Sequence, residues 1–169
     1  MKDSMINKLV IIGVGLIGGS FALSLRKAGL VKHITGLGRS KENLQQALEL
    51  GIIDEISDNY SQALNKADLV LLAVPVGQTA EILQKINPHL EPQTIISDVG
   101  STKQNVIAAA RSSIPEYFKN FVPAHPIAGA ELSGSSAANA ELFRDKNLIL
   151  TPSDETDIDS IESIQTLWK

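Results

Sequence analysis

Cysteine is absent from this chain of 169 residues. That absence excludes disulfides, thiolate catalysis and cysteine-based metal sites. The chain also lacks an excess of basic residues: its formal net charge of −4 argues against general affinity for nucleic acid, although it allows a local basic pocket. No apolar run approaches the roughly 20 residues that span a bilayer, and Met1–Asn7 is too short and too polar for a signal peptide. We therefore expect a cytoplasmic protein without nucleic-acid or membrane partners.

The chain is long enough for one domain with a substantial core and too short for two full domains. Strand-like and helical patterns alternate along it. The strand-like runs are Leu9–Ile12, His33–Leu37, Leu69–Val74, Thr94–Asp98, Phe121–Ala124 and Leu148–Thr151. The helical patterns are Leu16–Ala28, Lys41–Leu50, Ser61–Asn65, Gln78–Ile86, Lys103–Ser112, Ala137–Leu142 and Asp157–Trp168. This alternation predicts an α/β fold with a doubly wound, mostly parallel sheet of the Rossmann type.

The first apolar strand runs directly into a glycine pattern, Gly-x-Gly-x-x-Gly, and then into a helix. In that context the pattern is typical of a dinucleotide-binding turn. Gly13 permits the tight turn, Gly15 lets the backbone approach a pyrophosphate, and Gly18 lets the helix pack closely on the strand. The alternative is a glycine-rich turn that binds nothing. We predict that five residues of this turn bind the cofactor: Gly13, Gly15, Leu16, Ile17 and Gly18.

The end of the second strand bears on the choice of cofactor. Units that bind NAD carry an Asp or Glu near this point, which accepts hydrogen bonds from the adenosine ribose. Here that position is Gly38, followed by Arg39, Ser40 and Lys41. A guanidinium and a hydroxyl suit a phosphorylated ribose. We therefore predict that Arg39 and Ser40 contact the cofactor, with NADP preferred and NAD possible. The alternative is that Arg39 and Lys41 are solvated charges at the start of a helix and that NAD is still accepted. Ser40 is also placed to cap this helix.

Two further loops follow predicted strands, at the edge of the sheet where ligands of such folds bind. In the first, Val74 and Pro75 are placed to pack against the nicotinamide ribose, although Pro75 alternatively only ends the strand. In the second, Gly100 permits a sharp turn and the hydroxyl of Ser101 is placed to meet a substrate. We expect one of Ser101 and Thr102 to cap the next helix.

His125 follows a third strand, and Pro126 restricts it to extended geometry. A long polar loop with two glycines comes next, as is common for substrate-binding segments. A neutral imidazole here can accept a hydrogen bond from a substrate hydroxyl while hydride leaves the carbon. The alternative is a structural histidine. Neither His33 nor His89 has ligand spacing to another metal-binding residue, so we predict no metal site.

The last helical pattern carries an apolar stripe at Ile158, Ile161, Ile164, Leu167 and Trp168. We expect this stripe to be covered by a part of a longer protein beyond Lys169. The alternative is a helix that docks on the sheet of this domain.

Several segments together resemble the prephenate/arogenate dehydrogenase family of tyrosine biosynthesis, in order and over nearly the whole chain. The matching segments are Gly13–Ser20, Leu50–Asp54, Ala73–Pro75, Ser97–Lys103 and His125–Glu131. The resemblance implies NAD(P)-dependent oxidative decarboxylation of prephenate to 4-hydroxyphenylpyruvate, of arogenate to tyrosine, or of both. It implies that His125 accepts the hydrogen bond of the ring hydroxyl and that Ser101 bridges His125, substrate and nicotinamide.

The resemblance also implies a substrate site and a second domain. The substrate contacts would come from Ser101, His125, Ala130, Glu131 and Ser133, although family members often have a hydroxyl residue where this chain has Ala130. In the family a helical C-terminal domain forms a homodimer and brings a cation to the substrate carboxylate. The resemblance therefore divides this chain into a dinucleotide-binding domain, residues 1–155, and the start of a linking helix, residues 156–169. The chain lacks the family's helical dimerisation domain, and we expect little turnover from it alone.

Two other functions are compatible with the same scaffold. One is another NAD(P)-dependent enzyme, such as a β-hydroxyacid dehydrogenase or an imine reductase. Hydroxyacid dehydrogenases of that type usually rely on a lysine in a later helical domain, whereas this chain places a histidine after a strand. The other is a non-catalytic module that senses NAD(P) and signals through a partner.

Overall fold

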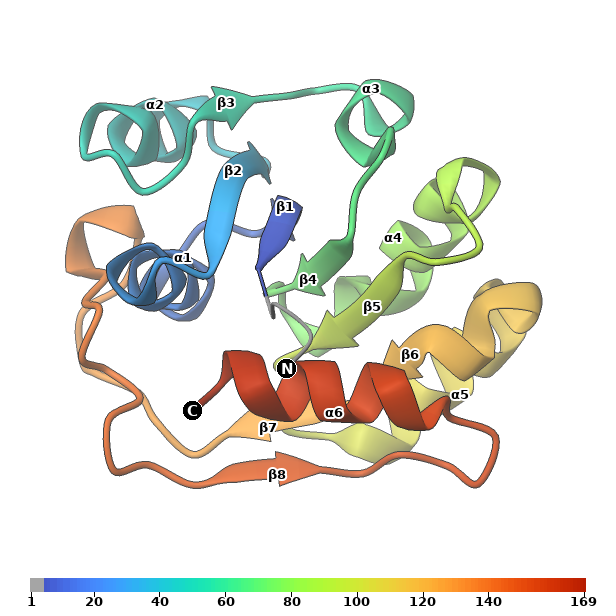
Figure 1. Cartoon of the computed structure of the whole chain (residues 1–169). Helices are drawn as coiled ribbons and strands as arrows, with labels where there is room; N and C mark the ends of the chain where they lie inside the picture. Colours follow the sequence, from blue (N-terminus) through green and yellow to red (C-terminus); the bar gives the residue numbers. More distant parts are fainter. Residues whose placement is uncertain (1–4) are drawn as a thin grey trace.

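The computed structural model describes residues 5–169. Most of the segment Met1–Asn7, which the sequence indicates is too short and too polar for a signal peptide, lies outside the described residues. A parallel sheet of six strands, in the order β3-β2-β1-β4-β5-β6, forms the centre of the molecule (Figure 1). The strands are β1 (Ile6–Ile12), β2 (Val31–Leu37), β3 (Glu55–Ile56), β4 (Leu69–Leu72), β5 (Ile95–Asp98) and β6 (Phe121–Val122). The strand order reverses between β1 and β4, where doubly wound sheets open a ligand crevice.

Within residues 5–169, five α-helices connect the strands of the main sheet: α1 (Leu16–Ala28), α2 (Lys41–Glu49), α3 (Tyr60–Leu64), α4 (Thr79–Ile86) and α5 (Lys103–Ser113). A sixth helix, α6 (Ile158–Leu167), follows the last strand. Four short 3-10 turns accompany them: η1 (Val76–Gln78), η2 (Asn87–His89), η3 (Pro115–Asn120) and η4 (Ser135–Ala137). Figure 1 shows α1 and α4 on opposite sides of the sheet. The predicted doubly wound, parallel sheet is therefore confirmed. None of the helices in the described chain is long and apolar enough to cross a membrane.

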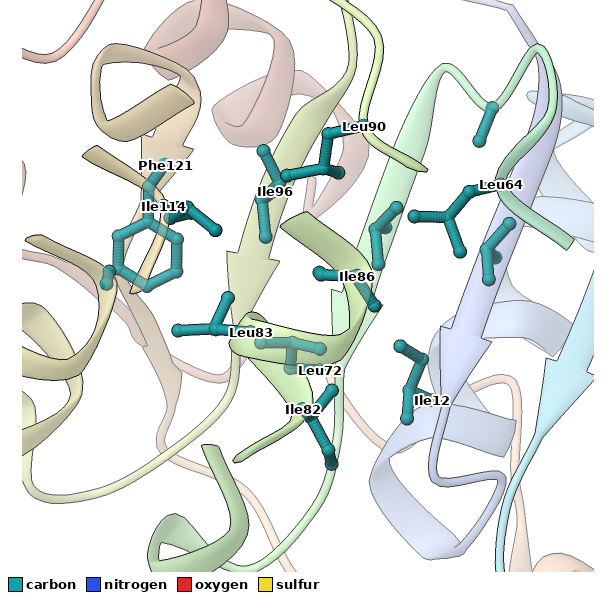
Figure 2. Close-up of a cluster of buried hydrophobic side chains, with 14 of the residues drawn as sticks. Ile12, Leu64, Leu72, Ile82, Leu83, Ile86, Leu90, Ile96, Ile114 and Phe121 are labelled. Atoms are coloured by element: carbon teal, nitrogen blue, oxygen red, sulfur yellow. The ribbon is translucent and has the colours of Figure 1, made fainter. Parts of the chain in front are cut away.

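Each face of the sheet has its own hydrophobic core. Alternate residues of a strand point to opposite faces, so in β1 the side chains of Val10 and Ile12 pack with α3, α4 and α5. Leu9 and Ile11 pack on the other face with α1, α2 and α6. Figure 2 shows the first core, in which side chains of α4 lie against the strands. Because both faces are covered, β4 and the second half of β1, Leu9–Ile12, are apolar throughout.

The predicted strand Phe121–Ala124 is wrong, because the structure divides it in two. β6 stays in the main sheet and ends at Val122, whereas β7 (Ala124–Pro126) pairs antiparallel with β8 (Leu148–Leu150) in a separate ribbon. Pro123 lies between them and has no amide hydrogen to continue the parallel ladder, while its carbonyl accepts a hydrogen bond from Thr151 N. His125 is therefore the middle residue of a short ribbon strand.

The predicted helix Ala137–Leu142 is also wrong. The segment forms only the turn η4, followed by irregular turns. Asn139 N donates to the Ser20 hydroxyl, and the Asn139 side chain accepts from Glu141 N. These side-chain bonds satisfy the backbone locally and compete with a helical ladder. Elsewhere the errors are small: β4 ends at Leu72 rather than Val74, and the two-residue strand β3 was not predicted.

The apolar stripe of α6 packs on this domain. The expectation that a part of a longer protein beyond Lys169 covers the stripe is therefore wrong. Ile164 and Leu167 are buried in the core that contains Phe21. The ring of Trp168 lies 4.5 Å from that of Phe21 and 4.8 Å from that of Phe143, between ring centroids. Only the first residue of the stripe, Ile158, is largely exposed, at 65%.

Candidate functional site

The glycine turn lies at the crevice between β1 and β4. Gly13 has a φ of +98°, and a Cβ there would lie 2.3 Å from the carbonyl oxygen of Ala73, just after β4. A Cβ on Gly18 would lie 2.4 Å from the carbonyl oxygen of Gly13. Both positions therefore require glycine, one for the turn and one for the close packing of α1. Gly15 is different, since nothing lies within 4 Å of its Cβ position.

The first turn of α1 is open as well. Gly15 is its N-cap residue, provides no side-chain acceptor, and no acidic residue lies in the first turn. The leading amides of a helix point outward and carry partial positive charge. The open space at Gly15 and these amides together form a cradle for a diphosphate. The residues predicted to bind the cofactor, Leu16 and Ile17 included, therefore fit such a group.

The residues after β2 are exposed, and the side chain of one of them, Ser40, is engaged in hydrogen bonds. Ser40 Oγ accepts a hydrogen bond of 3.1 Å from Asn43 N and donates to Glu42, so Ser40 caps α2. Arg39 is exposed at the same edge. The pKa of Glu81, in the first turn of α4, is lowered chiefly by its hydrogen bond with Lys85 and more weakly by the charge of Arg39.

The end of β4 forms the opposite wall of the crevice. Val74 is half-buried and packs against the core of α4 and α5. Pro75 is exposed at the start of η1, where its carbonyl accepts a hydrogen bond of 2.9 Å from Gln78 N. The strand therefore ends at Leu72, two residues before Val74, and Pro75 is exposed where the turn η1 begins.

A buried carboxylate, which the sequence analysis missed, lies between the two remaining site loops. Asp98 is 2% exposed and forms an ion pair with Lys103, whose side chain is 13% exposed. It also accepts hydrogen bonds from Gly100 N at 2.9 Å and Ala124 N at 3.2 Å. Burial raises the pKa of Asp98 and lowers that of Lys103, and the contact between the charges opposes both shifts. A signal was present in the sequence: a carboxylate ends an apolar strand, and a lysine begins the next helix.

Ser101 lies on the exposed turn between Asp98 and α5. Thr102 occupies the N-cap position, but its side chain makes no capping hydrogen bond. The expectation that one of the two hydroxyls caps α5 is therefore wrong. Ser101 is exposed, three residues beyond the end of β5.

His125 is half-buried, and its Nδ1 lies 3.3 Å from the carbonyl oxygen of Val99, the residue after β5. Because a carbonyl only accepts, Nδ1 must carry the hydrogen in this contact. Nε2 of the neutral ring is then an acceptor. Ile149 pairs directly with His125 across the ribbon and is 48% exposed. The two side chains share one face of the ribbon, which is the open one.

The other predicted substrate residues make no hydrogen bond, within the described chain, to His125 or Ser101. Ala130, Glu131 and Ser133 are exposed in the loop that follows β7. The far end of the loop is fastened instead, because Ser135 is 1% exposed and bonds to α2.

Asn43 makes that attachment and was also missed. Its Nδ2 donates to the carbonyl oxygen of Val14 at 2.6 Å, and its Oδ1 accepts from Ser135 N at 2.8 Å. The Ser135 hydroxyl donates to the backbone oxygen of Asn43 at 3.0 Å. One side chain therefore connects the glycine turn with the loop after His125.

A groove of about 1040 Å³ lies elsewhere on the molecule. It is lined by the C-terminal half of α1, by residues 140–150 and by the end of α6, including Phe143 and Trp168. None of the predicted site residues lines it. The chemistry-bearing residues instead gather at the carboxyl ends of β1, β4 and β5.

The chain is similar to known proteins of one family. Residues 21–169 match the family model described as prephenate dehydrogenase, nucleotide-binding domain. The chain is 39% identical over 170 residues to prephenate dehydrogenase of Bacillus subtilis, covering 100% of this chain and 44% of that protein. It is 35% identical to cyclohexadienyl dehydrogenase of Zymomonas mobilis, covering 95% of this chain and 54% of that protein.

Solved structures give the same result. Prephenate dehydrogenase of Aquifex aeolicus, in complex with hydroxyphenyl propionate and NAD+, is similar with a TM-score of 0.89 and 34% identity over 96% of this chain and 56% of that one. Arogenate dehydrogenase of Synechocystis is similar with a TM-score of 0.85 and 30% identity, covering 95% of this chain and 55% of that one. The chain therefore spans about half the length of the relatives that it matches.

Proposed function

The chain belongs to the prephenate dehydrogenase family as its nucleotide-binding domain, and we propose that the whole protein oxidises and decarboxylates prephenate, arogenate or both with NAD(P). The product is 4-hydroxyphenylpyruvate from prephenate and tyrosine from arogenate. One observation carries the proposal: His125 presents a free acceptor nitrogen at the same sheet edge as the open glycine turn. The names of the relatives support the substrate class, and the positions of His125 and the glycine turn support the chemistry.

In this proposal the protein binds the cofactor diphosphate at the first turn of α1, with Val74 and Pro75 beside the nicotinamide ribose. The cofactor supplies a hydride acceptor when bound. His125 Nε2 accepts the hydrogen bond of the ring hydroxyl, which favours loss of hydride from the carbon that bears it. The ring carboxylate leaves as carbon dioxide, and the ring becomes aromatic. Ser101, whose hydroxyl makes no capping bond, bridges His125, the substrate and the nicotinamide.

We propose that the exposed loop after β7 completes the substrate site. Its candidate contacts are Ala130, Glu131 and Ser133. We also propose that residues 1–155 form the dinucleotide-binding domain and residues 156–169 begin a helix that leads to a second, helical domain of the whole protein. The partial coverage of the relatives supports that second domain. Such a domain would hold the substrate carboxylate and form the homodimer.

The preference for NADP is a finer proposal that rests on Arg39. Gly38 leaves no carboxylate to repel a 2′-phosphate, and Arg39 is exposed beside it. Ser40 contributes less than expected, because its hydroxyl is engaged as the cap of α2. Titration of both nucleotides tests the proposal. We expect Arg39→Ala to weaken NADP binding about tenfold or more and to leave NAD binding unchanged. Lys32→Ala, an exposed cation near the start of β2, is the control; equal loss of both nucleotides would refute the phosphate role.

The activity itself is tested with the whole protein, assayed with prephenate and arogenate in the presence of either nucleotide. We expect reduced nucleotide and carbon dioxide to form in equal amounts with at least one of the two substrates. Oxidation of a hydroxyacid without decarboxylation would overturn the proposal in favour of a β-hydroxyacid dehydrogenase.

A further inference from the structure

The carboxylate of Asp98 joins the two loops that carry Ser101 and His125. Its Oδ1 accepts from Ala124 N, the residue before His125. Its Oδ2 accepts from Gly100 N, the residue before Ser101, and from Lys103. We propose that Asp98 is a positioning residue, which holds the Ser101 turn and the His125 strand in one arrangement. This inference rests on the proposed function for its catalytic consequence.

All three partners of Asp98 are donors. Two backbone amides and an ammonium face the two carboxylate oxygens. Only a group that accepts on both sides fits, and an ionised carboxylate does so. An asparagine presents an oxygen on one side and a hydrogen-bearing nitrogen on the other. It would therefore turn a donor either toward Ala124 N or toward Gly100 N and Lys103.

The same carboxylate determines where the His125 ring points. Val99 follows Asp98, and its carbonyl oxygen accepts the hydrogen bond of His125 Nδ1. Asp98 holds the backbone next to Val99 by accepting a hydrogen bond from Gly100 N. It holds the backbone next to His125 by accepting a hydrogen bond from Ala124 N. Both ends of the imidazole contact are therefore held by one side chain. The direction of His125 Nε2, the atom that meets the substrate hydroxyl, depends on it.

Stability alone is a weak reason for this ion pair. Removing two charges from water is unfavourable, and apolar residues of similar volume often stabilise a core as well or better. Asp98 is 2% exposed, and the Lys103 side chain is 13% exposed. Gly100 also packs tightly here, since a Cβ on it would lie 3.0 Å from Asp98 Oδ2 and 2.9 Å from Val76 Cγ2. The pair therefore contributes a defined geometry at the turn.

The test compares three variants of the whole protein. In Asp98→Asn, the new amide nitrogen faces a hydrogen-bond donor, and the charge of Lys103 loses its partner. The double variant Asp98→Asn/Lys103→Gln also removes that unpaired charge. Asp54→Asn is the matched control, because Asp54 accepts from Ile34 N at 2.7 Å and pairs with Arg26 away from the site. We expect kcat to fall on the order of 10-fold to 100-fold in both Asp98 variants. The double variant should regain thermal stability without regaining kcat, and Asp54→Asn should keep kcat.

A second readout is independent of turnover. In protein labelled with nitrogen-15 at histidine, the imidazole signals report which ring nitrogen carries the hydrogen. We expect His125 to be the Nδ1–H form in the wild type and a mixture of both forms in the two Asp98 variants. An unchanged His125 signal in the folded double variant would overturn the inference, whatever the turnover. If the wild type oxidises neither substrate, the proposed function fails, and this signal still decides the role of Asp98.

Discussion

His125 Nδ1 lies 3.3 Å from the carbonyl oxygen of Val99, so a histidine of the ribbon is tied to the end of the main sheet. The contact assigns the hydrogen to Nδ1 and leaves Nε2 as an acceptor. The same contact connects Val99, the residue after β5, with the strand β7, which contains His125. The direct partner of the ring is therefore a backbone carbonyl, and Asp98 acts on the ring through the backbone amides that it holds on either side.

Replacement of His125 by asparagine tests the role of that acceptor. The amide of an asparagine can still donate to Val99, but no ring nitrogen remains to meet a substrate hydroxyl. For the whole protein we expect kcat to fall on the order of 100-fold to 10,000-fold, with nucleotide affinity nearly unchanged. Steady-state kinetics and nucleotide titration measure the two quantities. His89→Asn, on η2, is the control. Unchanged function in His125→Asn would instead favour an NAD(P)-sensing module.

Substitutions at two glycines of the turn, Gly18 and Gly15, should affect stability and nucleotide binding separately. A Cβ on Gly18 would meet the Gly13 carbonyl at 2.4 Å, so Gly18→Ala should lower the free energy of unfolding by about 1–3 kcal/mol or more. Gly15 has open space around its Cβ position and a φ of −102°, so Gly15→Ala should fold normally. Its methyl group would occupy the space that we assign to the diphosphate. We therefore expect its nucleotide affinity to fall at least about tenfold.

Urea unfolding and nucleotide titration distinguish the two variants. If Gly15→Ala bound nucleotide like the wild type, the diphosphate would not lie at this turn. If Gly18→Ala were as stable as the wild type, the close packing of α1 on the strand would not be required.

The bounds of α1 were predicted correctly because both of its ends are encoded locally. The glycine turn precedes it, and Gly29 ends it with a φ of +68°. The strands β1, β2, β4 and β5 were predicted because apolar runs reveal them, whereas the two-residue strand β3 was not predicted. The division at Pro123 was missed, since it depends on pairing with β8, more than twenty positions later in the chain. Local patterns carry no information about such a partner.

The residues proposed for the site carry signals in the sequence, whereas the residues that hold them in place do not. Gly13 and His125 were singled out because their residue types and neighbours indicate a chemistry. Asp98 and Asn43 were missed because each acts through backbone amides or carbonyls of distant segments. Their partners are known only once the fold is known. The expectation that Ser101 or Thr102 caps α5 was wrong, because the side chain at the N-cap position, Thr102, makes no capping hydrogen bond.

Asn43 should control the order of the loop after β7. Asn43→Asp keeps an oxygen for Ser135 N but places a second oxygen against the carbonyl of Val14. We expect a loss of about 1–3 kcal/mol in the free energy of unfolding and faster amide exchange over residues 127–139. Ser135→Ala, which removes only the hydroxyl bonds, should cost about 1 kcal/mol. Hydrogen exchange measures the loop directly, and unchanged exchange in Asn43→Asp would show that the loop is held elsewhere.

The docking of α6 can be tested at Trp168. Its ring packs between Phe21 and Phe143, and its Nε1 is buried without a hydrogen-bond partner in the described chain. Trp168→Ala should therefore lower the free energy of unfolding by about 2 kcal/mol or more. Trp168→Phe retains a ring and removes the unsatisfied donor, so its loss should be about 1 kcal/mol or less. Ile158→Ala, at a largely exposed position, should change stability by less than about 0.5 kcal/mol. Urea unfolding gives the three values, and equal losses in Trp168→Ala and Ile158→Ala would mean that α6 does not dock on this domain in solution.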